Sequence, residues 1–510
     1  MVVLALLRWQ WRTLRSLGAA LLAGAVGGGG APSALLLATL CLWPFSAGLV
    51  ASASPPPTAP PLPSLASLLQ RVRAGLPGLP SPPRAVRDTM DALLDLATSA
   101  ASPTQAMSRA MQIMPPLNED VTSADILRAY GYPAETHFLW TEDGYRLQLN
   151  RVAPPSGGGR RQPLLLAHGM QTASPCFLLT GKEKSLATML YDAGYDVWLL
   201  NYRGTHYSTG HRNLSVNSEE FWKFSFHEHG VYDNPAVIDF VLERTGFPSL
   251  VYVSHSMGST SFMIMASMRP EYNDKILAAH LMAPAGPLHH HRSPFVGVLQ
   301  GLNNVTTALL DRLRLHHTMS LVYRLFRRLG SMLHSVPGVG ALLYAFTYTI
   351  VGYNPQAEYY ELPYFWNTIP SGGSWGEVLH YEQNAGRGVQ GFRRYDHGRK
   401  RNVEMYGSAV PPLYELSNIR APVHLYLAHN DVLCADKDME YLRSQFRNLA
   451  SVQYAPDPKF NHMDFFAART ADRQVYLPML KQMRRDADAP SPPADGGATA
   501  DNALPDEDEA

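Results

Sequence analysis

The sequence predicts an α/β fold with a mostly parallel central sheet that is covered by helices on both faces. Helix-length segments, such as residues 231–246, separate most of a series of short apolar runs. Apolar strands that alternate with helices are typical of parallel sheets, whose chemistry gathers at the carboxyl ends of the strands. Each run ends in a polar or glycine-rich turn: PLLLAHG (163–169), DVWLLNYRG (196–204), LVYVSHSMG (250–258), ILAAHLMAPAG (276–286) and PVHLYLAHND (422–431). An antiparallel hairpin around Asp143-Gly144 precedes them in FLWTEDGYRLQLNRV (138–152).

The composition allows a large core and argues against several classes of function. The chain has 510 residues, of which 46% are hydrophobic. The formal net charge of the whole chain is zero, but its ends differ. Residues 1–87 contain seven arginines and no acid, and residues 486–510 contain eight acids and no base. The net charge of the middle is therefore about +1. A nearly neutral body argues against a nucleic-acid partner. The only cysteines are Cys41, Cys176 and Cys434, so the body holds at most one disulfide.

No metal or other cofactor is expected from the sequence. The chain has no CxxC motif, and the run His289-His290-His291 is more typical of a solvated loop than of a metal site.

The N-terminal segment favours entry into the secretory pathway. Three arginines precede a long uncharged stretch whose most apolar part is SALLLATLCLWPFSAGLVASA (33–53). Its Ala-Ser-Ala end fits a signal peptidase site, whereas its length also suits a retained signal anchor. An arginine-rich, acid-free start leaves a mitochondrial transit peptide as a third reading. Asn213 and Asn304 begin glycosylation triplets, which would be used if the body reaches the lumen.

The stretch VYVSHSMGST (251–260) predicts a nucleophile elbow. A buried strand there ends at Ser-His-Ser-Met-Gly and a helix follows, so that Ser256 would project from a sharp turn at the sheet edge. The positions two before and two after the nucleophile must be small, and Ser254 and Gly258 meet that requirement. The five-residue pattern is common by chance, and its place directly after a buried strand makes Ser256 the candidate nucleophile.

A serine nucleophile needs a base and an orienting carboxylate, which this type of fold supplies in the order Ser, Asp or Glu, His. His462 in KFNHMDF follows a short strand near the end of the folded region, and Asp431 closes PVHLYLAHND. The rival base His255 is expected to pack beneath the elbow, because adjacent side chains diverge there. The oxyanion hole is expected to use the backbone N–H groups of Met257 and Met170.

With these residues in place, the chain resembles the acid lipase family, which includes gastric and lysosomal acid lipases and yeast steryl ester hydrolases. The likeness runs from about 118 to 480 and rests on a series of motifs in the family's order. These motifs are NEDVTSADILRAYGYPAETHFLWTEDGYRLQLNRV (118–152), AHGM, NYRGTHYS (201–208), FSFHEHGVYDNPAVIDF (224–240), the elbow, VLHYEQNAGRGVQGFRRYDHG (378–398), AHNDVLCADKD and FNHMDF.

The resemblance implies an α/β-hydrolase fold and a carboxylic ester hydrolase acting on long-chain neutral lipids, either triacylglycerols or steryl esters. It puts Ser256, Asp431 and His462 at the family's triad positions. Met170 and Met257 fall at its oxyanion positions, where the family usually has Leu and Gln. Two features depart from the family: Ser254 replaces the usual glycine of the elbow, and residues 287–420 lack the cysteines of a common disulfide.

An insertion of roughly 130 residues between Ala285 and Ser417 is too long for a loop and predicts a helical cap. Within it, residues 320–333 form an amphipathic basic segment that suits either a cap helix or docking at a lipid surface, and residues 336–351 suit a cap interior or acyl groove. A membrane or lipid-droplet surface is therefore a possible partner, and the oligomeric state stays open. A small-acyl esterase or thioesterase, and an inactive lipid- or protein-binding hydrolase, are the alternatives.

The predicted organisation has six parts. These are a signal peptide or anchor (1–53), a proline-rich spacer with a poorly assigned helical segment (54–117), the first part of the core (118–286), the cap (287–416), the second part of the core (417–485) and a disordered acidic tail (486–510).

Overall fold

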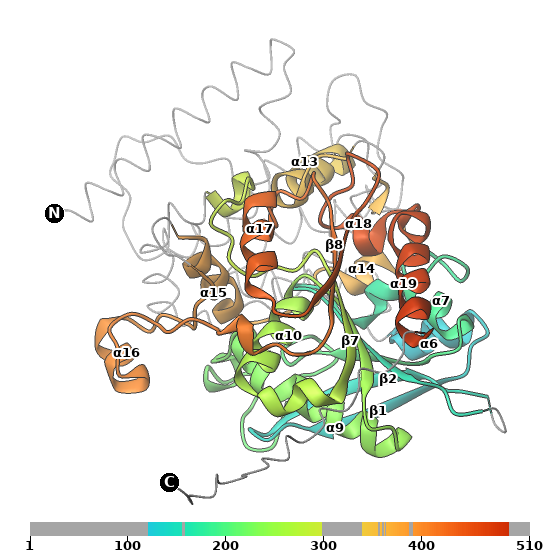
Figure 1. Ribbon diagram of the computed structural model, residues 1–510, viewed down its shortest axis with the longest axis horizontal. Helices are drawn as coiled ribbons and strands as arrows, with labels where there is room; N and C mark the ends of the chain where they lie inside the picture. Colours follow the sequence, from blue (N-terminus) through green and yellow to red (C-terminus); the bar gives the residue numbers. More distant parts are fainter. Residues whose placement is uncertain are drawn as a thin grey trace, which may run out of the picture.

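The computed structural model describes residues 121–155, 159–297, 339–354, 357–359, 362, 364–386 and 391–488. Within these residues one nine-stranded sheet has the order β1-β2-β4-β3-β6-β7-β8-β9, and β5 pairs with β2 (Figure 1). The strands are β1 (Ala134–Trp140), β2 (Tyr145–Val152), β3 (Pro163–Ala167), β4 (Asp196–Asn201), β5 (Gly210–His211), β6 (Leu250–His255), β7 (Ile276–Met282), β8 (Val423–Leu427) and β9 (Leu449–Tyr454).

The sheet begins with the predicted hairpin and continues as parallel strands. β1 and β2 are antiparallel around Asp143-Gly144, where Gly144 has a positive φ of 96° that a side chain would oppose. β2 also runs antiparallel to β4, and every pairing from β4 through β3, β6, β7 and β8 to β9 is parallel. Because helices cover the parallel strands, β3, β4, β6 and β8 are buried along their whole length. The predicted fold class is confirmed.

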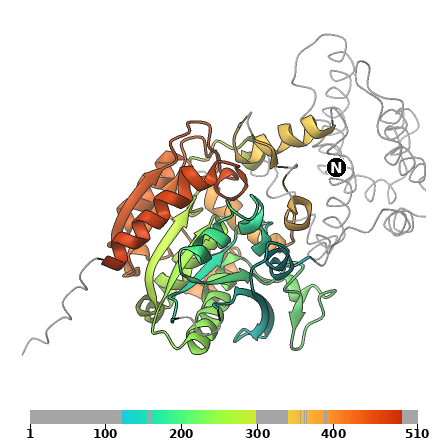
Figure 2. The ribbon, with the colours of Figure 1, turned by 90° about the vertical axis from the view of Figure 1, so that its right-hand side faces the viewer.

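Helices lie on both faces of the sheet. In Figures 1 and 2 the C-terminal helix α19 is on one face with α7, and α9 and α10 are on the other. α9 begins at a proline-containing first turn and ends at Gly246, which adopts the left-handed conformation favoured at helix ends. The helices of the core are α6 (Ser123–Ala129), α7 (Leu186–Asp192), α8 (Phe226–Glu228), α9 (Asn234–Thr245), α10 (Met257–Met268), α17 (Asp436–Gln445), α18 (Asp464–Ala467) and α19 (Leu477–Asp488).

The described residues of the range predicted as a cap include further helices. They are α13 (Val339–Val351), α14 (Phe365–Thr368), α15 (Trp375–Ala385) and α16 (Arg399–Tyr406). α13 contains no charged residue, and it occupies most of the apolar stretch singled out in the sequence. The amphipathic segment 320–333, the leader 1–53 and the spacer lie outside the described residues, and the predicted domain boundaries remain predictions.

Two findings bear on disulfides and on membranes. Cys176 and Cys434 are both free thiols in the buried core, so the disulfide that the sequence allowed for the body does not form. Among the described residues, none of the helices combines the length and the apolar character needed to cross a bilayer.

Candidate active site

Ser256 lies at a sharp turn between strand β6 and helix α10. Its backbone has φ 51° and ψ −115°, a conformation that non-glycine residues rarely adopt and that the surrounding structure must hold. The Ser256 N–H donates to the carbonyl of Met282 on the next strand at 3.0 Å. A side chain at Gly258 would collide with the backbone of Ala167, which explains the glycine there. The turn therefore has the strand–serine–helix geometry expected of a nucleophile elbow.

Ser254 occupies the other small position of the elbow. It is fully buried on β6 beside Ala167 of β3, and its hydroxyl lies 2.9 Å from the hydroxyl of Ser259 in α10. The serine that replaces the family's usual glycine is thus accommodated. It adds a hydrogen bond between strand β6 and helix α10, on either side of the elbow.

His462 links Ser256 to a buried carboxylate. Its Nε2 lies 2.8 Å from the Ser256 hydroxyl, and its Nδ1 lies 2.7 Å from Oδ2 of Asp431. All three side chains are buried, with Ser256 exposed by 8% and Asp431 by 1%. The structure brings together residues from three distant stretches, each at a carboxyl end of the sheet, in the order of contacts that serine hydrolases require.

The turn after β8 holds Asp431 in place. The backbone N–H groups of Leu433 and Cys434 both donate to Oδ1 at 2.9 Å, which leaves Oδ2 for His462. The Cys434 thiol is a neighbour that no sequence motif indicates: its Sγ lies 3.8 Å from His462 Nδ1 and donates to the carbonyl of Ala283. Burial raises the pKa of this thiol well above its usual value, so it is a neutral packing group.

A second buried carboxylate, Asp464, shapes the loop that carries His462. Oδ2 of Asp464 accepts hydrogen bonds at 2.8 Å from the Asn461 N–H and the Asn354 side chain, and Oδ1 accepts one at 2.6 Å from the Tyr359 hydroxyl. Burial raises the pKa of Asp464 to about 6, against these hydrogen bonds, which lower it. Sequence reasoning missed Asp464, although it stands two residues after the candidate base.

The inserted segment contributes directly to this loop. The His462 N–H donates to the carbonyl of Val351, and the side chain of Asn461 donates to the carbonyl of Gly352 at 2.9 Å. Gly352 has a φ of 108°, and a side chain there would collide with the backbone of Asn430, beside Asp431. The end of α13 therefore lies between the turn of the candidate acid and the loop of the candidate base.

His255, the rival base, packs below the elbow. Its Nε2 lies 2.8 Å from the backbone carbonyl of His462, and its ring lies against Gly169, where a Cβ would sit 2.9 Å from Nδ1. Burial lowers the pKa of His255 well below its usual value. A neutral ring that donates to the His462 carbonyl supports the loop of the candidate base.

The backbone at Met170 and at Met257 passes close to Ser256. Met257 is the first residue of α10, so its N–H belongs to the unsatisfied first turn of that helix. Met170 follows Gly169, whose added Cβ would sit 3.2 Å from the Cβ of Ser256. Within the described part of the chain, neither of the two methionine N–H groups donates a hydrogen bond to a protein acceptor. Both groups are therefore available to an oxygen bound beside Ser256.

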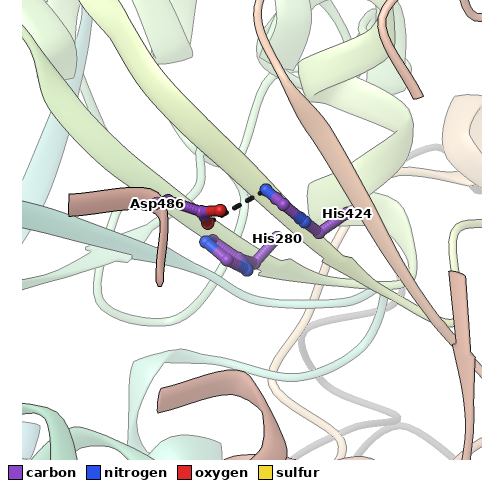
Figure 3. Close-up of side chains that lie close together, drawn as sticks. All are labelled: His280, His424 and Asp486. Carbon is purple, nitrogen blue, oxygen red and sulfur yellow. Dashed lines mark ion pairs between the residues drawn. The ribbon is translucent and has the colours of Figure 1, made fainter. Parts of the chain in front are cut away.

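Two side-chain clusters in the described residues could hold a metal by composition. One is Asp431, Cys434 and His462. The two ring nitrogens of His462 already lie within hydrogen-bond distance of Asp431 and Ser256. The other is His280, His424 and Asp486, which lie close together where α19 meets β7 and β8 (Figure 3). The histidine run at 289–291 has protein partners instead, since His290 pairs with Asp438 at 2.8 Å.

The fold and the residues at its carboxyl edge define an α/β hydrolase, and comparison with known proteins narrows this class. Residues 162–467 match the model of the alpha/beta hydrolase fold, and residues 123–181 match that of a partial alpha/beta-hydrolase lipase region. The chain belongs to the acid lipase family, so the resemblance seen in the sequence is confirmed.

Three relatives illustrate the match. Lipase 3 of Drosophila melanogaster is 38% identical over 69% of this chain and 90% of its own, and Lipase 1 of the same fly is 35% identical over 70% and 78%. Gastric triacylglycerol lipase of Bos taurus is 32% identical over 71% of this chain and 91% of its own. Among solved structures, a thermophilic esterase from Thermogutta terrifontis covers 69% of this chain and 99% of its own at 13% identity, with a TM-score of 0.39 that is too low to bear on function.

Proposed function

We propose that the protein is a lipase that hydrolyses the ester bonds of long-chain neutral lipids, triacylglycerols or steryl esters, through an acyl-enzyme. The observation that carries this proposal is the continuous set of contacts from Asp431 through His462 to Ser256, at 2.7 and 2.8 Å. Ser256 would be the nucleophile, His462 the general base and then acid, and Asp431 the group that orients the imidazole.

In the acylation step, the Ser256 hydroxyl oxygen attacks the carbonyl carbon of the ester while its proton passes to His462 Nε2. The carbonyl π-bond opens to an oxyanion, which the N–H groups of Met170 and Met257 would stabilise. The ester C–O bond then breaks, and the alcohol leaves with the proton from His462. Because Asp431 accepts from Nδ1, the ring is held in the tautomer that presents the lone pair of Nε2 to Ser256.

Deacylation repeats the sequence with water. His462 takes a proton from water, the resulting hydroxide attacks the acyl carbon, and the Ser256 oxygen leaves and regains a proton from His462. The fatty acid is released and the enzyme is restored. One ester and one water therefore give one acid and one alcohol.

Two observations support a long-chain lipid as the substrate. One relative is named a gastric triacylglycerol lipase, and both family-model matches are to hydrolases, one of them a lipase region. The segment that reaches the loop of His462 comes from α13, which is apolar and uncharged. An apolar element beside the loop of the candidate base suits an acyl chain at a lipid–water interface, whether of a membrane or of a lipid droplet.

The location proposed is the secretory pathway, with the body in the lumen or outside the cell. The charge and apolar pattern of residues 1–53 favours this location. Asn213, which begins one of the two glycosylation triplets, is exposed. N-terminal sequencing of the mature protein tests this: a start near Ser54 means a cleaved signal, whereas an intact Met1 in a carbonate-resistant membrane fraction means an anchor.

The function is tested with purified full-length protein on triolein, cholesteryl oleate and a short-chain ester across a range of pH. We expect turnover of a long-chain substrate that Ser256→Ala abolishes, together with labelling by a fluorophosphonate probe. Exclusive turnover of the short-chain ester would favour a small-acyl esterase instead. Wild-type protein that neither labels nor hydrolyses any ester would favour an inactive, lipid- or partner-binding hydrolase, and labelling of Ser256→Ala would move the nucleophile elsewhere.

A further inference from the structure

The turn after β3 carries one of the two candidate oxyanion donors, the N–H of Met170. This residue follows Gly169, where a Cβ would sit 2.9 Å from Nδ1 of His255 and 3.2 Å from the Cβ of Ser256. The glycine lets the turn approach the elbow closely, but it also removes the side chain that would restrict rotation of the backbone. The peptide between Gly169 and Met170 therefore needs other contacts to keep its orientation.

The orientation of this peptide decides which polar group it offers to an oxygen bound at Ser256. The peptide is trans, because the only cis peptide bond among the described residues is Ile369-Pro370. In a trans peptide the carbonyl of Gly169 and the N–H of Met170 point in opposite directions. A contact that holds the carbonyl on one side thus holds the N–H on the other. Rotation of the peptide by half a turn would exchange the two groups, and a carbonyl oxygen would repel an oxyanion.

Two buried side chains hold the Gly169 carbonyl. Nδ1 of His168 lies 2.8 Å from its oxygen, and the Thr172 hydroxyl donates to the same oxygen at 2.9 Å. The Thr172 N–H adds a longer contact at 3.4 Å. His168 is exposed by 1% and Thr172 by 6%. The carbonyl is therefore held inside the protein, and the Met170 N–H, without a protein acceptor among the described residues, is turned to the other side.

The tautomer of His168 follows from its second contact. The backbone N–H of Tyr202, directly after β4, donates to Nε2 of His168 at 3.2 Å. A backbone N–H can only donate, so Nε2 carries the lone pair and Nδ1 carries the proton of a neutral ring. Burial lowers the pKa of His168 to about 4, against the hydrogen bond to Gly169, which raises it. At neutral pH the ring is therefore a donor to the Gly169 carbonyl.

The inserted segment holds the next residue of the turn. Gln171 has a φ of 61°, which residues other than glycine rarely adopt and which the surrounding structure must hold. Its carbonyl accepts a hydrogen bond at 2.9 Å from the N–H of Ser371. The turn is thus fixed at two carbonyls, that of Gly169 from the core and that of Gln171 from the insertion.

We propose that His168 and Thr172 are positioning residues for the oxyanion hole, an inference that rests on the proposed function. By donating to the Gly169 carbonyl, they aim the Met170 N–H at the charge that develops beside Ser256. Their hydrogen bonds disfavour a rotated peptide, because rotation would leave the buried Nδ1–H of His168 without its acceptor. They also polarise the peptide, since donors at a carbonyl strengthen the N–H of the same peptide as a donor.

Thr172→Val is the first test, because valine has nearly the shape of threonine and lacks the hydroxyl. We expect kcat on the best substrate to fall by about three- to tenfold at unchanged KM, since an oxyanion hole acts on the transition state rather than on the bound ester. The rate of labelling by a fluorophosphonate should fall in parallel. Thr172→Ser restores the hydroxyl and should stay within about twofold of the wild type.

The matched control is Thr188→Val in α7. The buried Thr188 hydroxyl makes the same kind of contact, a 2.9 Å hydrogen bond to the carbonyl three residues earlier, that of Ser185. This control should lower Tm as Thr172→Val does and should keep kcat. If Thr172→Val lowers Tm and leaves both kcat and the labelling rate unchanged, its hydroxyl is only structural and the proposal is overturned.

Two substitutions of His168 separate the two nitrogens of its ring. Asparagine places an amide N–H near the position of Nδ1 and keeps the donor to Gly169, whereas glutamine places its amide near Nε2 and keeps the acceptor for Tyr202. We expect His168→Asn to retain about fivefold or more of the kcat of His168→Gln, whose loss should approach the roughly 10² of a missing oxyanion donor. The opposite order would contradict the proposal. If either variant fails to fold, Thr172→Val decides.

The wild-type protein separates this inference from the proposed function. Full activity and labelling in the wild type together with unaffected Thr172→Val and His168→Gln would overturn the positioning role alone. A wild type that neither labels nor hydrolyses any ester would overturn both. Loss of kcat and labelling rate in these variants at unchanged KM, with Thr188→Val unaffected, would support both.

Discussion

Two buried histidine–carboxylate pairs in this protein contain the same chemical groups and differ in the hydrogen-bond donors around the carboxylate. The first is Asp431 with His462, beside Ser256. The second is Glu377 of α15 with His229, where Oε1 lies 3.4 Å from Nε2. In both pairs the side chains are almost completely buried. Asp431 is 1% and His462 6% exposed, and Glu377 is 1% and His229 0% exposed.

The difference lies in what donates to each carboxylate. Asp431 accepts from two backbone N–H groups and from the His462 ring, and such donors stabilise a charged carboxylate. Glu377 has one oxygen, Oε2, without a hydrogen-bond partner among the described residues. Burial raises the pKa of Glu377 to about 8, and the negative charges of Asp233 and Glu228 add to the rise, against a backbone hydrogen bond that lowers it.

The surroundings of His229 also favour its neutral form. Burial lowers its pKa well below the usual value, and the nearby charge of Arg203 lowers it further. At neutral pH the second pair therefore consists of a protonated glutamate and a neutral imidazole. The donors around a carboxylate, rather than the identity of its partner, therefore decide whether a histidine–acid pair can orient a base.

The largest expected effect is on kcat, which substitutions in the first pair should lower far more than a substitution in the second pair. His462→Ala should lower kcat by a factor of about 10³ or more, and Asp431→Asn should lose a comparable factor, because members of a triad act as a unit. Glu377→Gln mimics the neutral acid and should keep kcat within about tenfold of the wild type. The measurement is kcat on the best substrate, with Tm recorded for each variant.

A loss of activity in Glu377→Gln as large as that in His462→Ala, at unchanged Tm, would show that the second pair takes part in the chemistry. A mild effect of His462→Ala would instead break the assignment of the base. Either result would remove the distinction between the pairs.

The next effect concerns stability and pH. The folded pKa of Glu377, about 8, is above its unfolded value of 4.5, so the folded state binds more protons between these values. Stability from this group is complete below about pH 4.5 and is lost as pH rises through 8, by up to roughly 5 kcal/mol. Glu377→Gln carries no titrating group and should therefore lose less stability than the wild type from pH 5 to 8.

The test is the free energy of unfolding in denaturant at several pH values for both proteins. Asp464 and Asp233, whose pKa values burial raises to about 6, also lower stability as pH rises, but they do so in both proteins. The difference between the two curves therefore isolates Glu377. Parallel curves over this range would mean that the glutamate is already ionised in the folded protein.

Much of the fold could be predicted because its signals are local. The β1–β2 hairpin, the strand–serine–helix turn at Ser256 and the apolar runs of β3, β4, β6, β7 and β8 each follow from a few consecutive residues. The start of α9 differs, since its pattern suggested residue 231 whereas the α-helix begins at Asn234 after a π-helical turn. The two-residue strand β5 is too short to leave a periodic signal.

The contacts that hold the site together could not be predicted in the same way. Tyr359 meets Asp464 across 105 residues of sequence, and Glu377 reaches His229 from within the inserted segment. His280 and His424 become neighbours only through the register of β7 and β8. Such meetings depend on how strands align and how an insertion packs back on the core, and no short motif encodes either.

The smallest expected effect tests a third buried polar pair, Ser254 with Ser259 at the elbow. Both hydroxyls are neutral and buried, 2.9 Å apart, and Ser254 faces β3 and α10 rather than the substrate side of Ser256. Ser254→Gly should therefore leave kcat/KM equal or better. Stability should fall by about 1–2 kcal/mol, because Ser259 loses its partner and glycine weakens a strand.

The double variant Ser254→Gly, Ser259→Ala sharpens this test. It removes the unpaired hydroxyl and should recover the hydrogen-bond part of the loss, leaving about 0.5–1 kcal/mol from the glycine. The measurements are kcat/KM and the free energy of unfolding for the wild type and both variants. A different result would contradict this: Ser254→Gly could lose most of its activity at nearly unchanged stability. The Ser254 hydroxyl would then take part in the reaction, as the Asp431–His462 pair does, rather than only stabilise the elbow.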